Sequence, residues 1–252
     1  MMWPYTARKG MILKSKLYIQ MQAICLIGAS GRMGSTIQAL LPEPLKTYLF
    51  TRLDLKNSNS LIDAAQKSDI VIDFSNPENL EFAINACLRS QTPYLCGTTG
   101  LTTQHFELLK MAGAKIPVLY AANTSVGIAI LKKAIALVAK AFGASVGTNI
   151  DIAISETHHN LKKDAPSGTA LAIGNVIAQT LKNSPQISYS SLRGGNVVGE
   201  HIAHFFHQDE VIHLSHECLN RNVFANGAIK AANWLAKQQP GFYSMDDLLE
   251  LE

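Results

Sequence analysis

Hydrophobic positions divide the first half of the chain into short apolar runs and stretches with helical spacing. Five short apolar runs, the first of them partly β-branched, predict strands, with helical patterns between the later ones. These runs are residues 23–27, 48–51, 70–74, 94–97 and 118–121. Strands that alternate with helices predict a doubly wound parallel sheet, an α/β fold of the Rossmann type.

The alternation changes after Asn123. Apolar spacing predicts helices over residues 128–142 and from about residue 167 to residue 181, with a strand over residues 150–156 between them. Period-two alternation then predicts strands at residues 188–192, 197–206 and 211–216. These elements indicate a second, α+β domain with a mixed or antiparallel sheet. A last helical pattern, residues 225–237, is placed to return to the first domain.

Three segments follow from these patterns. Residues 1–20 have no clear period and are expected to form an extension outside the fold, with Met11 and Met21 as alternative starts. Residues 21–124 and 222–252 are expected to form a dinucleotide-binding domain, and residues 125–221 the second domain.

Composition excludes several classes of protein. The chain has 252 residues, of which 47% are hydrophobic, so it can bury one large or two modest cores. Its net charge of +3 and the lack of a basic run argue against nucleic-acid binding. The sequence has no apolar stretch of the length that spans a bilayer and no signal-peptide core, which argues against membrane insertion and secretion. Four scattered cysteines favour a reducing cytoplasm, without a disulfide framework or zinc site.

A glycine turn follows the first predicted strand. Glycines at positions 28, 31 and 34 allow a tight turn, a close approach of backbone to phosphate and close packing of the next helix, whose N-terminus attracts a pyrophosphate. A purely structural turn is the alternative. The dinucleotide contacts expected here are Gly28, Ala29, Ser30, Gly31, Arg32 and Met33.

The end of the second predicted strand bears on cofactor choice. NAD-specific sites usually place an acidic residue there, whereas this chain has Thr51 and Arg52. Arg52 and Arg32 match the geometry of a 2′-phosphate, which favours NADPH over NADH; alternatively, both are solvated surface residues. Two loops after later strands are expected to bind the nicotinamide and its ribose, unless they are ordinary turns. Their residues are Gly97, Thr98, Thr99, Ala121, Ala122, Asn123 and Thr124.

Residues 156–169 carry the densest chemistry. His158 or Lys162 is expected to supply a proton from a loop between a strand and a helix. The free N–H groups of Gly168 and Thr169 at the helix start would bind a carboxylate. The alternative is that the adjacent histidines only pack or face solvent. Five later histidines lack metal-site spacing, so no metal is expected: His201, His204, His207, His213 and His216.

Several strings in this chain together resemble the 4-hydroxy-tetrahydrodipicolinate reductase family. They are GASGRMG, DFSNPE, GTTG, AANTSVG, ETHHNLKKDAPSGTA, RGGNVVGEH and FANGAIKAA. The resemblance implies an enzyme that uses NADPH or NADH to reduce a cyclic dicarboxylate, with loss of water, in diaminopimelate and lysine biosynthesis. It implies a proton donor or acceptor at His158, a proton donor at Lys162 and substrate carboxylates on His159, Gly168 and Thr169. It also implies a homotetramer joined through the second domain, which would bind the substrate.

Two other functions remain open on the sequence. The chain is also compatible with a two-domain dehydrogenase acting on a semialdehyde or a sugar, although no activating group stands next to Cys96 or Cys218. A regulator that senses NADPH without turnover is the alternative from another class. An assay for turnover separates these possibilities.

Overall fold

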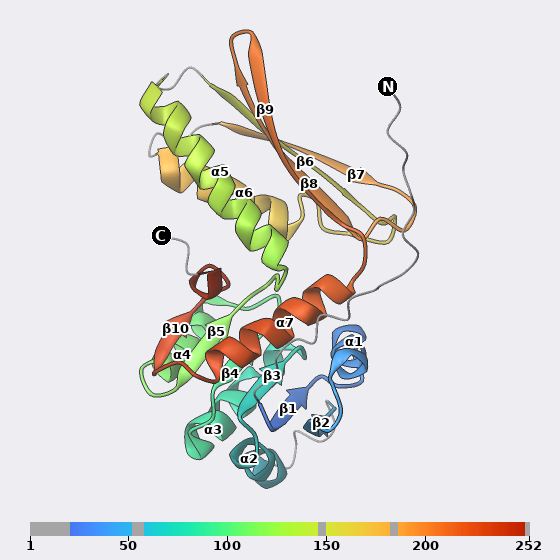
Figure 1. The fold of residues 1–252 in the computed structure, drawn as a ribbon, viewed down its shortest axis with the longest axis vertical. Helices are drawn as coiled ribbons and strands as arrows, with labels where there is room; N and C mark the ends of the chain where they lie inside the picture. Colours follow the sequence, from blue (N-terminus) through green and yellow to red (C-terminus); the bar gives the residue numbers. More distant parts are fainter. Residues whose placement is uncertain (1–20, 52–57, 146–149, 182–185, 250–252) are drawn as a thin grey trace, which may run out of the picture.

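The computed structural model describes residues 21–51, 58–145, 150–181 and 186–249, and Figure 1 shows their arrangement. Two sheets lie at opposite ends of the molecule, joined by the start of α5 and by the segment from β9 to α7 (Figure 1). The expected extension, residues 1–20, lies outside the described residues, as do Arg52 and the last residues, 250–252.

The first sheet has six parallel strands in the order β10-β5-β4-β3-β1-β2, which confirms the predicted Rossmann-type fold. Its strands are β1 (Ala23–Ile27), β2 (Lys46–Phe50), β3 (Ile70–Asp73), β4 (Tyr94–Cys96), β5 (Pro117–Tyr120) and β10 (Gly241–Tyr243). The sequence did not predict β10, because three residues after a proline leave no readable period. The chain reverses direction across the sheet between β1 and β3, where such folds bind ligands.

Helices cover both faces of this sheet, which is why β1 and β3 are apolar without alternation. On one face, α1 (Arg32–Leu40) and α7 (Asn222–Leu235) pack against Ile24, Leu26 and Ile72. The other face is covered by α2 (Ser58–Gln66), α3 (Leu80–Ser90) and α4 (Thr103–Gly113). Helix α7 therefore does return to the first sheet, as its apolar period predicted. The described part of this half also contains the short 3-10 helices η2 (Pro77–Asn79) and η3 (Asp247–Leu249).

The second sheet is mixed, as predicted, in the order β7-β6-β8-β9. Its strands are β6 (Asp151–His158), β7 (Ile187–Arg193), β8 (Gly199–His207) and β9 (Glu210–Cys218). Strands β6 and β7 are parallel, and β8 is antiparallel to both β6 and β9. Helices α5 (Val126–Ser145) and α6 (Gly168–Leu181) cover one face, onto which Ile152, Ile154 and Phe205 point.

Strand β6 extends further than the sequence predicted. It runs to His158, two residues past the expected end, because its alternating buried positions continue through Glu156 and His158. The prediction that His158 lies in a loop is therefore wrong. Its side chain is fixed by a strand that is hydrogen-bonded on both sides, and Lys162 stands in the loop that follows.

Candidate active site

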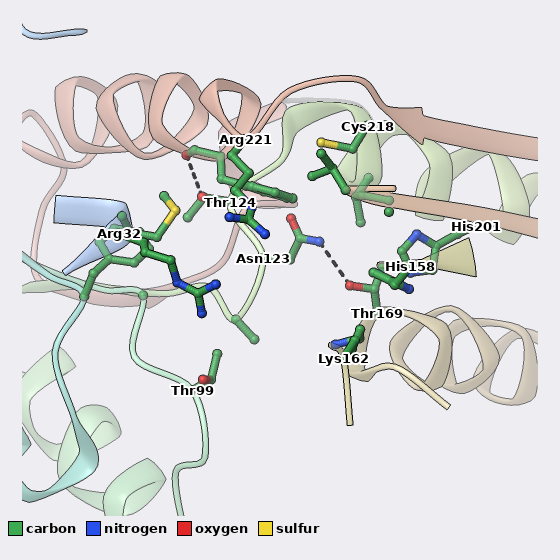
Figure 2. Close-up of a pocket in the computed structure, with 18 of the residues that line it drawn as sticks. Arg32, Thr99, Asn123, Thr124, His158, Lys162, Thr169, His201, Cys218 and Arg221 are labelled. Atoms are coloured by element: carbon green, nitrogen blue, oxygen red, sulfur yellow. Dashed lines mark hydrogen bonds between the residues drawn. The ribbon is translucent and has the colours of Figure 1, made fainter. Parts of the chain in front are cut away.

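A cavity of about 500 Å³ opens where the two sheets approach each other. Figure 2 shows Arg32 and Thr99 on its first-sheet side, and His158, Lys162 and Thr169 on the side of the second sheet. Parallel strands end here, so the loops after β3, β4 and β5 form one wall. The lining residues are Arg32, Met33, Phe74, Ser75, Gly97, Thr98, Thr99, Ala122, Asn123, Thr124, Ile128, His158, His159, Lys162, Thr169, Val198, Gly199, His201, His216, Cys218, Arg221 and Phe224.

A second cavity, of about 690 Å³, adjoins the first beside the start of α6. Asn123, His158, Lys162 and Thr169 line both cavities, so a molecule in one lies next to the other. The second cavity adds Ala121 and Gly168 to the predicted residues brought together. Most of the predicted site residues thus meet in one place, although they come from both domains.

Most residues of the glycine turn do not line the cavity. Gly28 has a positive φ of 81°, and a side chain there would meet the Phe74 carbonyl oxygen at 2.5 Å. The N–H groups of Gly28 and Ala29 donate to the Phe50 carbonyl, at 3.0 and 3.1 Å. From the turn only Arg32 and Met33 reach the cavity; Gly28, Ala29, Ser30 and Gly31 line neither space. The predicted contacts at Gly28 and Ala29 would therefore not use their N–H groups.

The start of α6 has the geometry of an anion site. Ser167 caps the helix by accepting from the Ala170 N–H at 3.2 Å. The N–H groups of Gly168 and Thr169 belong to the first turn and have no intrahelical acceptor. Across the cavity, the Asn123 side-chain amide donates to the Thr169 hydroxyl at 3.1 Å (Figure 2). This bond links the loop after β5 to the start of α6.

Lys162 extends from the loop after β6 towards this helix start. Its ammonium group contacts both carboxylate oxygens of Asp164 at 2.8 Å. The hydrogen bond from Lys162 lowers the pKa of Asp164. A ligand carboxylate that reaches Lys162 must compete with Asp164 for the ammonium group. Of the two partners in this ion pair, Asp164 is the more exposed to solvent.

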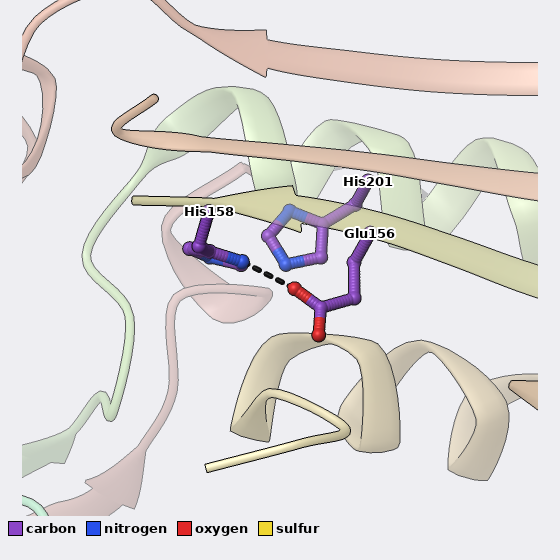
Figure 3. A group of neighbouring side chains, drawn as sticks. All are labelled: Glu156, His158 and His201. Carbon is purple, nitrogen blue, oxygen red and sulfur yellow. Dashed lines mark hydrogen bonds and ion pairs between the residues drawn. The ribbon is translucent and has the colours of Figure 1, made fainter. Parts of the chain in front are cut away.

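Three buried side chains, Glu156, His158 and His201, meet at the edge of the cavity (Figure 3). Glu156 bonds to the His158 ring through one oxygen and to Arg193 through the other, at 2.7 Å to Nη2. His201 contacts the Ser167 hydroxyl at 3.1 Å. Burial lowers the pKa of His201 to about 4 and also lowers the pKa of His158. These residue types can ligate metal; among the described residues Glu156 bonds to His158 and Arg193 and His201 Nε2 contacts Ser167, whereas His201 Nδ1 has no partner.

Several cavity residues were not predicted as site residues. Val198, Gly199 and His201 come from the RGGNVVGEH string, which carries part of the family resemblance but in which the sequence predicted no site residue. Phe74 and Ser75 come from DFSNPE, in which Asp73 is fully buried. Burial raises the pKa of Asp73, which accepts hydrogen bonds from Tyr94 at 2.7 Å and from Thr98 at 3.4 Å.

Four further unpredicted lining residues are His216, Cys218, Arg221 and Phe224. They lie at the end of β9 and the start of α7, where no sequence period points to a site. Only the return of α7 to the first sheet brings them to the cavity.

Comparison with known proteins agrees with this geometry. Residues 22–124 match the family model described as dihydrodipicolinate reductase, N-terminus, and residues 127–249 match the model for its C-terminus. The chain belongs to the dihydrodipicolinate reductase family. Family membership implies that the chain binds a pyridine nucleotide.

Relatives match along almost their whole length. The 4-hydroxy-tetrahydrodipicolinate reductase of Rickettsia rickettsii is 40% identical over 241 residues, covering 90% of this chain and 99% of the relative. That of Zymomonas mobilis is 41% identical over 251 residues, covering 90% and 97%. A dipicolinate-bound dihydrodipicolinate reductase from Paenisporosarcina sp. TG-14 has the same fold, with a TM-score of 0.71 at 21% identity, covering 90% of this chain and 99% of that one.

Two global features complete the description. Within the described residues, no helix is long and apolar enough to cross a membrane. The four cysteines are all free and buried. Burial raises the pKa of the Cys25 and Cys96 thiols to about 12.

Proposed function

We propose that the two adjoining cavities form the active site of a reductase that converts 4-hydroxy-tetrahydrodipicolinate to tetrahydrodipicolinate with loss of water. The activity itself follows from the family, as a step of diaminopimelate and lysine biosynthesis. The observation that carries the location is that His158, Lys162 and Thr169 share cavities with the loops after β4 and β5. Proton-donating side chains and the expected nicotinamide-binding loops thus face the same space.

The substrate is a ring with two carboxylates, and the start of α6 suits one of them. The Gly168 and Thr169 N–H groups and the positive end of the helix dipole favour an anion there. His159 is proposed as a further carboxylate contact, because its Nδ1 is buried without a partner among the described residues and its side chain lines the cavity. A dipicolinate-bound structure of a protein with this fold supports a ligand of this shape.

Lys162 is proposed as the proton donor. It carries an ammonium group at the boundary of the two cavities, within reach of a molecule held at the start of α6. His158 is proposed to give or accept a second proton, since its ring lies at the same boundary. Bound NAD(P)H would supply the hydride.

The cofactor-binding residues of this chain fit a dinucleotide. Gly34 is buried against the backbone of Gly28 and Ala29, so α1 packs closely on the glycine turn. No side chain caps that helix, and its free N–H groups are available to a pyrophosphate. Arg32 points into the cavity (Figure 2) and is proposed, together with Arg52, to favour NADPH by contacting the 2′-phosphate.

We further propose a cytoplasmic homotetramer joined through the second sheet. One face of that sheet is covered by α5 and α6, while Leu192, Phe206 and Val211 are exposed on the other. Exposed apolar side chains gathered on one face are typical of an interface. Sedimentation analysis should give a tetramer, and a monomer at micromolar concentration would refute this part.

A coupled assay tests the function directly. Dihydrodipicolinate synthase, supplied with pyruvate and aspartate semialdehyde, generates the substrate in the cuvette. Addition of this protein should then consume NADPH, measured by the fall in its absorbance, and controls without synthase should show no change. NADPH binding without consumption would instead support the regulator alternative.

A further inference from the structure

Two charged residues beside His158, Glu156 and Arg193, have no role in the function proposed so far. Glu156 and His158 lie two residues apart on β6, so both side chains point to the same face of the strand. They continue the row of Ile152 and Ile154 towards the cavity. An ionised carboxylate that is only 2% exposed is costly unless it is paired, which makes its partners informative.

Arg193 is the partner that keeps Glu156 ionised. It lies on β7, directly beside His158 in the register of the two parallel strands. Its Nη2 donates to Glu156 Oε1 at 2.7 Å and to the Asp164 carbonyl at 2.7 Å. Burial alone would raise the pKa of Glu156, but hydrogen bonds from Arg193, Ser191 and His158 bring it down to about 2. Glu156 is therefore a carboxylate with no proton to donate.

The other oxygen of Glu156 contacts His158 Nδ1 (Figure 3). Since the carboxylate can only accept, the proton of this bond belongs to Nδ1. Burial lowers the pKa of His158, so the ring is neutral near pH 7 and Nε2 is unprotonated. That second nitrogen lies over Gly199: a Cβ built on Gly199 would be 2.9 Å from it. Both Gly199 and His158 line the first cavity, next to His201.

We propose that Glu156, held by Arg193, is a positioning residue that fixes His158 with its proton on Nδ1 and its free Nε2 lone pair on the cavity side. The proposal rests on the function proposed above and deepens it. In this state His158 takes a proton at Nε2 before it can give one, and Lys162 remains the proposed proton donor. Of the two roles left open for His158, it therefore accepts a proton first and donates one afterwards.

The pH dependence follows from the groups around the ring. Glu156 on β6 raises the pKa of His158, whereas Lys162 in the following loop and Arg193 on β7 lower it. His201 on β8 lies edge-on at 5.0 Å between ring centroids. Acceptance at Nε2 is lost as the pH falls through the pKa of His158. Removal of the Glu156 charge lowers this pKa, so the acidic limb of kcat/KM should move to lower pH.

The direct test is the ring nitrogen spectrum of the full chain labelled with ¹⁵N-histidine. The His158 signals, assigned by their loss in His158→Gln, should show a protonated Nδ1 and an unprotonated Nε2 at neutral pH. A wild-type spectrum with the proton on Nε2 overturns the proposal. This measurement needs no activity and no change at Glu156, so it decides the question even where Glu156→Gln does not fold.

The kinetic test is Glu156→Gln beside Glu81→Gln, the same change at an exposed position of α3. We expect kcat of Glu156→Gln to fall about 10- to 100-fold, as for other partners that orient a functional imidazole, with the KM for NADPH retained. Its acidic limb should move to lower pH, while Glu81→Gln matches wild type. An unmoved limb indicates a purely structural role and overturns the proposal. A wild-type enzyme that does not reduce the substrate refutes the proposed function instead, whatever the spectrum shows.

Discussion

Replacement of Thr169 by valine removes one hydroxyl from the proposed carboxylate site and little else. Valine keeps the β-branched shape, and the backbone N–H groups of Gly168 and Thr169 stay in place at the start of α6. Ser167 still caps the helix through the Ala170 N–H. The variant should therefore fold normally and alter the ligand contact alone.

The magnitude follows from the bonds that the hydroxyl makes. Its bond to Asn123, at 3.1 Å, is present in the free enzyme, so its loss affects the free and bound states alike to a first approximation. The bond that changes is the one to the substrate carboxylate, and hydrogen bonds to charged groups contribute about 1.5–3 kcal/mol. Because Thr169 is partly exposed, the lower half of this range applies, which corresponds to a rise in substrate KM of about 10- to 40-fold.

The assay compares Thr169→Val with Thr180→Val under saturating NADPH. Thr180 lies in the last turn of the same helix, where its hydroxyl donates to the Val176 carbonyl at 2.8 Å, far from the cavities. We expect the KM for substrate and the Kd for dipicolinate to rise in Thr169→Val only. The Kd for NADPH, followed by fluorescence, should change by less than about threefold, because only the Asn123 contact reaches the cofactor loop.

Two results would refute this reasoning. An unchanged KM and an unchanged dipicolinate Kd would mean that the Thr169 hydroxyl makes no bond to a substrate carboxylate. Equal weakening of NADPH and dipicolinate would mean that the substitution disturbs the whole cleft through Asn123 rather than one ligand contact.

Two further predictions concern the proton donors and the cofactor. Lys162→Ala and His158→Ala should each lower kcat by roughly 10²- to 10⁴-fold while NADPH binding survives, and near wild-type turnover in both would remove the chemistry from this region. Arg32→Ala and Arg52→Ala should each reduce the ratio of kcat/KM for NADPH to that for NADH, by up to about tenfold at low salt and less at higher salt. A wild-type preference for NADH, or an unchanged ratio in both variants, would exclude these arginines from a 2′-phosphate site.

Local sequence patterns were enough to predict most elements of the fold. Buried runs such as residues 23–27 and 70–74 are apolar without alternation because helices cover both faces of the first sheet. The alternation in residues 199–207 reflects a sheet with one covered face. The start of α6 was also readable, since a capping hydroxyl and a helical period are both local signals.

Part of the candidate site was readable as well, where chemistry is concentrated in one string. Residues 156–169 bring His158, His159, Lys162 and Thr169 to the cavities because they end one strand, form the loop after it and begin one helix. A glycine turn after a strand likewise predicted the place of α1, although the N–H groups of Gly28 and Ala29 turned out to bond to β2.

Contacts between segments far apart in the chain were decided only by the tertiary structure. Arg193 meets Glu156 because β7 pairs in parallel with β6, a register that no local period encodes. Arg221 and Phe224 reach the cavity because α7 returns to the first sheet. The sequence alone indicates where most strands and helices form and which residue types are available. The packing of the two sheets decides which of them face one another, because that depends on long-range pairings whose free energies are set by the whole core.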